Sequence, residues 1–61
     1  MLSESEVKRA YEIALVELDQ AEEEMVLAKR TGTEEEILNA IIEYRLAKER
    51  LWVLRRVLYG N

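Results

Sequence analysis

Residues 29–37 read KRTGTEEEI, and this short stretch decides the fold because it holds the end of one helix and the start of another. Thr33 with Glu36 three residues later has the pattern of a capping box, in which each side chain accepts a hydrogen bond from the other residue's backbone N–H. Gly32 is available for the left-handed residue that ends many helices. We therefore predict two helices joined by a turn over residues 31–33.

The outer ends of the chain carry the same kinds of signal. Ser3 and Glu6 repeat the capping-box pattern, and Leu2 and Val7 stand where a hydrophobic staple forms around it. Gly60 is placed to end the second helix. We expect one domain over residues 1–61, with a helix at 4–30, a turn at 31–33 and a helix at 34–59.

Apolar and small residues recur in both halves in alternating steps of three and four, which is typical of helices that pack along a heptad seam. Because the connection has only three residues, the helices must fold back antiparallel. A turn centred on Gly32 makes the numbers of facing residues add up to about 64, so we expect Arg45 opposite Asp19 and Arg55 opposite Arg9. The predicted hairpin seam consists of Val7, Tyr11, Ala14, Leu18, Met25, Ile37, Tyr44, Leu51, Leu54 and Leu58.

The second helix has a further apolar face, nearly opposite its seam. A helix that is apolar on two sides is normally contacted from both directions. We therefore predict an all-α chain, an antiparallel two-helix hairpin that assembles into a homo-oligomeric helical bundle with the second helix inside. A dimeric four-helix bundle and a small cyclic ring both fit this pattern. The predicted oligomer interface comprises Leu38, Ile42, Leu46, Trp52, Val53 and Val57.

The composition argues against catalysis and metal binding. The chain has no His, Cys, Pro or Phe, which excludes disulfides, the common zinc ligand sets and the Glu-x-x-His motifs of di-iron bundles. The few hydroxyl side chains stand at helix caps or in the turn, with no base beside them. We interpret the acidic run at residues 22–24 as exposed to solvent. The run at residues 34–36 lies in the first turn of the second helix, where carboxylates are favoured. We expect no enzyme activity, no cofactor, no metal and no small-molecule ligand.

Charge and hydropathy bear on possible partners. Nine basic against 13 acidic residues give a net charge of −4, and apolar runs such as residues 51–54 are far too short to cross a membrane. We expect a soluble chain with itself as partner and no membrane contact. The sequence does not give its location, which we expect to be cytoplasmic if the chain is natural or as expressed. Residues 45–56 carry a local charge of +4 that could contact phosphates, but the basic positions spread over more than half of the helix circumference. Nucleic-acid binding is therefore not our first expectation.

Two resemblances follow from these features. The size, single hairpin and heptad seams resemble the Rop family of plasmid-encoded RNA modulators, whose hairpins dimerise into four-helix bundles. That resemblance implies an alternative function: a natural regulatory or interaction module that binds nucleic acid through the basic second helix. The paired capping boxes, strict heptads, glycine stops and minimal turn also resemble de novo designed helical-hairpin oligomers, in which caps and patterning are chosen by rule. This second resemblance implies a purely structural, self-assembling protein.

Overall fold

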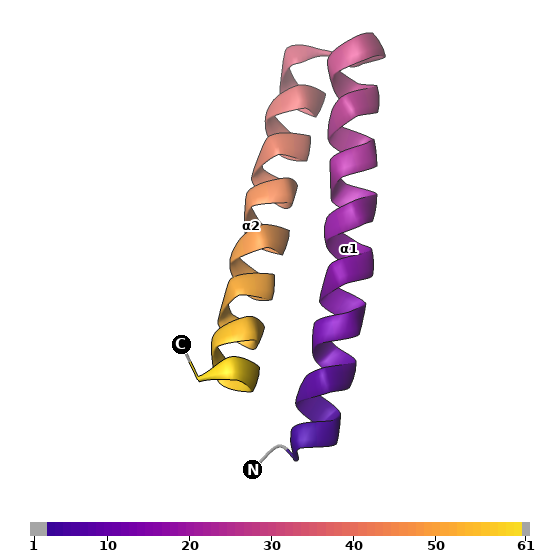
Figure 1. Ribbon diagram of the computed structural model, residues 1–61. Coiled ribbons are helices and arrows are strands. Elements are labelled where there is room, and N and C mark those ends of the chain that lie inside the picture. The colour runs from indigo at the N-terminus through magenta and orange to yellow at the C-terminus, as the bar shows by residue number, and fades with distance from the viewer. Residues whose placement is uncertain (1–2, 61) are drawn as a thin grey trace.

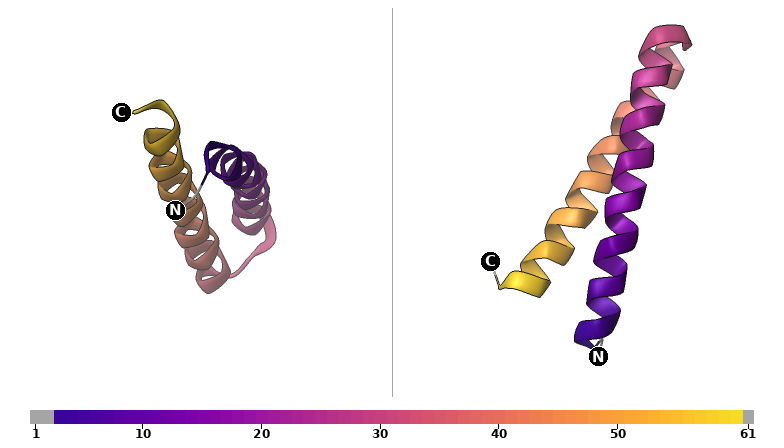
Figure 2. Two further views of the ribbon diagram at one scale, coloured as in Figure 1. Left: turned by 90° about the horizontal axis from the view of Figure 1, so that it is seen from below. Right: turned by 45° about the vertical axis from the view of Figure 1, so that its right-hand side comes forward.

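The computed structural model describes residues 3–60 as two antiparallel helices, α1 (Glu4–Thr31) and α2 (Glu34–Tyr59), packed against each other (Figure 1). The prediction of an all-α chain with two packed helices is confirmed. The hairpin measures 42 × 16 × 16 Å, and its long dimension matches the 28 residues of α1 at about 1.5 Å per residue. Two further views show that the helix axes are inclined to one another (Figure 2).

The start of α1 is capped by Ser3, but the expected capping box is only partly formed. The Ser3 hydroxyl accepts a hydrogen bond from the Glu6 N–H at 3.2 Å and donates one to Glu6 Oε1 at 3.2 Å. The Glu6 carboxylate thus binds the cap's side chain, whereas a full box binds its backbone N–H. Leu2, half of the expected hydrophobic staple, lies outside the described residues.

The start of α2 carries the complete box. Thr33 Oγ1 accepts from the Glu36 N–H at 3.2 Å, and Glu36 Oε1 accepts from the Thr33 N–H at 3.0 Å. At the other end of α2, Gly60 has φ 72° and ψ 19°, the left-handed conformation expected of a helix stop. The sequence therefore predicted both ends of α2 correctly.

The end of α1 differs from the expectation. The helix continues through Thr31, whose Oγ1 donates to the Leu27 carbonyl oxygen at 3.2 Å. Gly32 has φ −87° and ψ 165°, so the expected left-handed residue here was wrong. Instead, the glycine allows its backbone to lie close to that of Ala28, because a Cβ at this position would lie 2.7 Å from the Ala28 carbonyl oxygen. That oxygen also accepts the Gly32 N–H at 2.7 Å.

The contact between the helices is narrow and rich in alanine. Four apolar residues are buried, and among residues 3–60 no large side chain is fully buried. All ten residues predicted for the seam are buried or half-buried in this contact, together with Ala10 and Ile41, which lie beside it. The hairpin thus brings its helices close together over a thin apolar core. The four buried residues are Val7, Ala14, Ala21 and Ala47.

The register between the helices differs from the prediction. Arg50 pairs with Glu17 and Tyr11 contacts Tyr59, so the numbers of facing residues add up to 67 and 70 instead of about 64. The expected register assumed a turn centred on Gly32. The pairing shifts because α1 is one residue longer than expected and the helix axes are inclined. The first turn of α1 consequently extends beyond the end of α2 (Figure 1).

We predict that Gly32→Ala destabilises the hairpin by about 1–3 kcal/mol, because the added methyl group would press on backbone atoms of Ala28. Urea denaturation followed by circular dichroism measures this. Thr31→Ala is the matched control: it changes an exposed neighbour to a better helix former and should leave the midpoint nearly unchanged. Equal midpoints for Gly32→Ala and the wild type would contradict the close approach.

We also predict a low pKa for Glu36. The hydrogen bond from the Thr33 N–H, followed by that from the Thr33 hydroxyl, lowers the pKa of Glu36 below 4.5. The stabilisation from this carboxylate is therefore complete above pH 4.5 and is lost as the pH falls through the lowered pKa. Carboxyl-detected NMR titration measures the value.

Two variants at residue 33 provide the controls for this titration. Thr33→Pro suits the cap's φ of −75° but removes both donors, so the pKa of Glu36 should rise back towards 4.5. Thr33→Ser keeps both donors and should keep the pKa low. A Glu36 pKa that does not respond to Thr33→Pro would show that the box is not its cause.

Candidate self-association surface

The outward side of α2 carries a row of exposed apolar side chains, which we call the outer stripe. Its members are separated by steps of four, four, seven and four residues, so they follow one side of the helix. Each is at least 53% exposed. Ile42 in the stripe and Leu51 in the seam are nine residues apart, which places them on opposite sides of α2. The outer stripe consists of Leu38, Ile42, Leu46, Val53 and Val57.

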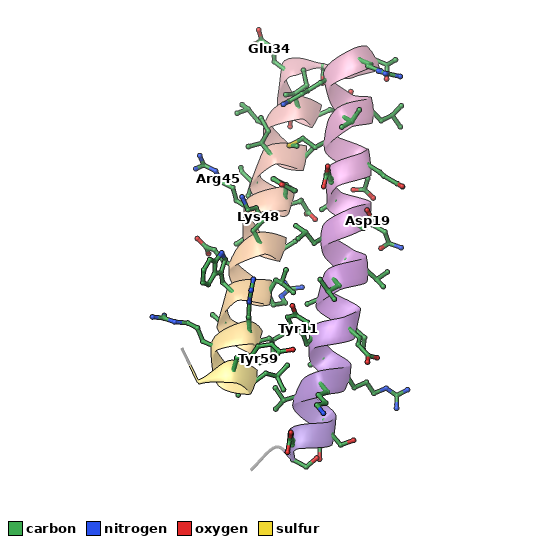
Figure 3. All side chains as sticks on the ribbon, viewed as in Figure 1. Tyr11, Asp19, Glu34, Arg45, Lys48 and Tyr59 are labelled. Carbon is green, nitrogen blue, oxygen red and sulfur yellow. The ribbon has the colours of Figure 1, made fainter. Side chains whose placement is uncertain are left out.

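Trp52, the sixth residue predicted for the interface, lies at the edge of this surface. It is 59% exposed and lines an open hollow of about 470 Å³ together with Tyr11, Arg55 and Tyr59. The Tyr11 and Tyr59 rings make an edge-to-face contact with centroids 6.4 Å apart, near the open end of the hairpin (Figure 3). Trp52 therefore stands between the seam and the outer stripe, accessible from either side.

Glu49 is a member of this surface that the sequence reasoning missed. It fills the step of seven between Leu46 and Val53, so a charged side chain interrupts an otherwise apolar row. Arg45 lies one turn before it, and Figure 3 shows Arg45 projecting away from α1. Among the residues the structure describes, neither forms an ion pair within 4.0 Å. The sequence does contain a signal for Glu49, because it occupies the regular three- and four-residue spacing of the row. A search restricted to apolar residues does not detect it.

The outward side of α1 is different. Ile13, Val16 and Leu27 are exposed and lie on one side of α1, but Gln20 and Glu23 occupy the positions between Val16 and Leu27 and leave a gap of three helical turns. α1 carries eight acidic and four basic residues, whereas α2 carries five of each. Among the described residues, the longest row of exposed apolar side chains is thus on α2, with Glu49 as its one charged position.

The basic residues of α2 differ in what they contact. Arg50 Nη1 lies 3.3 Å from Glu17 Oε2 on α1, and Lys48 Nζ lies 5.4 Å from the centroid of the Tyr44 ring. Arg45 points to solvent, so the expected pairing of Arg45 with Asp19 was wrong. Arg55 was expected to lie opposite Arg9 of α1. In the structure it lines the hollow together with Tyr11, another residue of α1.

The described carboxylates do not form a metal centre. Within residues 3–60, no three acidic side chains lie close enough together to hold a cation. In the same part of the chain, neither helix has the length and apolar character required to cross a bilayer.

Comparisons with known proteins identify no relative. No protein-family model matches the chain, and no curated protein or solved structure matches it significantly. The resemblance to the Rop family therefore stays one of size and hairpin architecture.

We predict that the Glu17–Arg50 ion pair contributes little to stability. Both side chains are about half exposed, so water and salt screen the pair, and such pairs are worth about 0–1 kcal/mol. Glu17→Gln should lower the free energy of unfolding by less than about 1 kcal/mol, and 1 M NaCl should abolish the difference. Denaturant titrations at low and high salt measure both. A loss of several kcal/mol would mean that this pair, and not the seam, sets the register.

Proposed function

We propose that this chain is a structural, self-assembling helical hairpin whose α2 outer stripe binds further copies of the chain. The observation that supports the proposal most strongly is the contrast between its two apolar surfaces. The seam contains no fully buried large side chain among the described residues, while the outer stripe leaves five large ones more than half exposed. The apolar side chains of α2 are therefore divided between the thinly packed seam and the exposed outer stripe.

The energetics favour covering this face. Fully burying a Val, Leu or Ile side chain is worth about 1.5–3 kcal/mol, so covering five half-exposed side chains contributes roughly 5 kcal/mol per copy. The net stability of a small domain is only about 5–15 kcal/mol. Assembly through the outer stripe would thus supply a large part of the stability of each hairpin.

The proposal includes the kind of protein this is. Rule-like caps, strict seams and the minimal loop support a chain designed for assembly, with no catalytic activity, and a natural interaction module is the alternative origin. Both origins share the same physical requirement, a second copy or other helix against α2. A dimer and a small ring each satisfy that requirement.

We predict that Ile42→Glu converts the assembly to monomers, because it places a charge in the outer stripe without touching the seam. Native mass spectrometry across a dilution series from about 100 to 1 µM spans the affinities typical of small interfaces and measures the masses directly. We expect a wild-type oligomer and a predominantly monomeric variant.

Val16→Glu is the matched control for this experiment. It adds the same charge at an equally exposed apolar residue on α1, at 57% exposure against 53% for Ile42. It should leave the oligomer intact. A wild-type chain that stays a folded monomer at every concentration, or dissociation by Val16→Glu and not by Ile42→Glu, would overturn the proposal.

A further inference from the structure

The spacing of the outer stripe is the same in both directions. With Glu49 included, its six positions are separated by steps of four, four, three, four and four residues. Turning α2 end over end therefore superimposes the row on itself, with Leu38 at the level of Val57 and Ile42 at the level of Val53. The centre of this symmetry lies between residues 47 and 48. A surface with this property can pack against a reversed copy of itself along its whole length.

The charges of α2 are also complementary to a reversed copy. Residues 34–43 contain four glutamates and no basic residue, whereas residues 45–56 carry a net charge of +4. In a reversed pair, the acidic first turns of each helix lie beside the basic last turns of the other. In a parallel pair, Arg56, which flanks the outer stripe, would lie at the level of its own counterpart, and like charges at close range oppose association.

Glu49 and Arg45 provide the most specific evidence. They stand two residues on either side of Ala47, on the same flank of the outer stripe, and neither has an ion partner among the described residues. In a reversed pair about the centre of the outer stripe, Glu49 of each copy lies at the level of Leu46 of the other, one residue or about 1.5 Å from the level of Arg45 and on the same flank. A carboxylate within an apolar contact requires such a partner, because an unpaired charge is costly to remove from water.

We propose that two copies of the hairpin associate as a two-fold dimer in which their α2 helices pack antiparallel, with two symmetry-related Glu49–Arg45 ion pairs across the axis. This inference rests on the proposed function, since it requires that the outer stripe bind a second copy. It adds the direction and register of the contact. Because the outer stripe and the seam lie on opposite sides of α2, the four helices form a layer with the α2 helices in the middle and the α1 helices outside.

Disulfide formation tests the direction. The chain has no cysteine, so Leu38→Cys and Val57→Cys each introduce a single thiol at positions that are 60% and 63% exposed. In the antiparallel dimer, a mixture of the two variants forms the mixed disulfide when oxidised glutathione is added as the two-electron oxidant and is itself reduced to two thiols. Proximity raises the effective thiol concentration to the millimolar range, so this should be roughly tenfold or more faster than either variant alone at micromolar concentration. The three possible disulfides differ in mass and are separated by mass spectrometry.

Charge exchange tests the register. Arg45→Glu and Glu49→Arg should each weaken the dimer roughly tenfold, because each places like charges across the axis. The double variant R45E/E49R restores opposite charges. It should return the dissociation constant to within about threefold of the wild type, which is a difference in binding free energy of less than about 1 kcal/mol. Circular dichroism at high concentration confirms that each variant remains helical, since both positions are exposed in the hairpin.

The outcomes separate the two proposals. A wild-type chain that is monomeric by native mass spectrometry overturns the proposed function. An intact wild-type oligomer in which Leu38→Cys alone forms the rapid disulfide overturns the antiparallel arrangement and indicates parallel helices. An intact oligomer that forms none of these disulfides rapidly, or a double variant that stays as weak as the single ones, overturns the contact and leaves the outer stripe against another surface.

Discussion

The close approach of α1 and α2 along an alanine-rich seam is the constraint on which the rest of this structure depends. Ala14, Ala21 and Ala47 are buried at the contact, and small side chains let two helices come near each other. The same small side chains bury little apolar surface. The larger seam residues, such as Leu18 and Leu51, are only half covered. A hairpin built in this way forms with a definite shape but with a thin interior.

This constraint explains why the outward side of α2 matters. A monomeric surface helix is expected to be polar on its far side, and α1 largely follows that rule with eight acidic residues. α2 does not, because Ile42 and Val53 lie opposite Leu51 and are exposed. The single charge within that row, on Glu49, fits a surface that selects its partner's orientation as well as binding it. In the dimer that we propose, apolar contact supplies affinity and charge supplies direction.

Much of the fold could be predicted from the sequence, because heptad spacing and caps are local properties. Thr33 and Glu36 are three residues apart, so their pairing depends on little else. Gly32 was misread because a glycine serves either a left-handed backbone or a close approach, and the sequence does not distinguish these. The register shown by Glu17 and Arg50 depends on how the loop and the inclined axes combine, which is not a local property. Glu49 was overlooked because it belongs to the outer stripe by position and not by polarity.

The arrangement of the chain ends has a consequence of its own. The first and last described residues, Ser3 and Gly60, both lie at the end of the hairpin remote from the loop (Figure 1). In the proposed two-fold dimer with antiparallel α2 helices, the two copies would present these ends at opposite extremities of a rod about as long as one hairpin. Cargo joined to either end would then be held apart on a rigid spacer, and neither attachment would obstruct the surface between the copies.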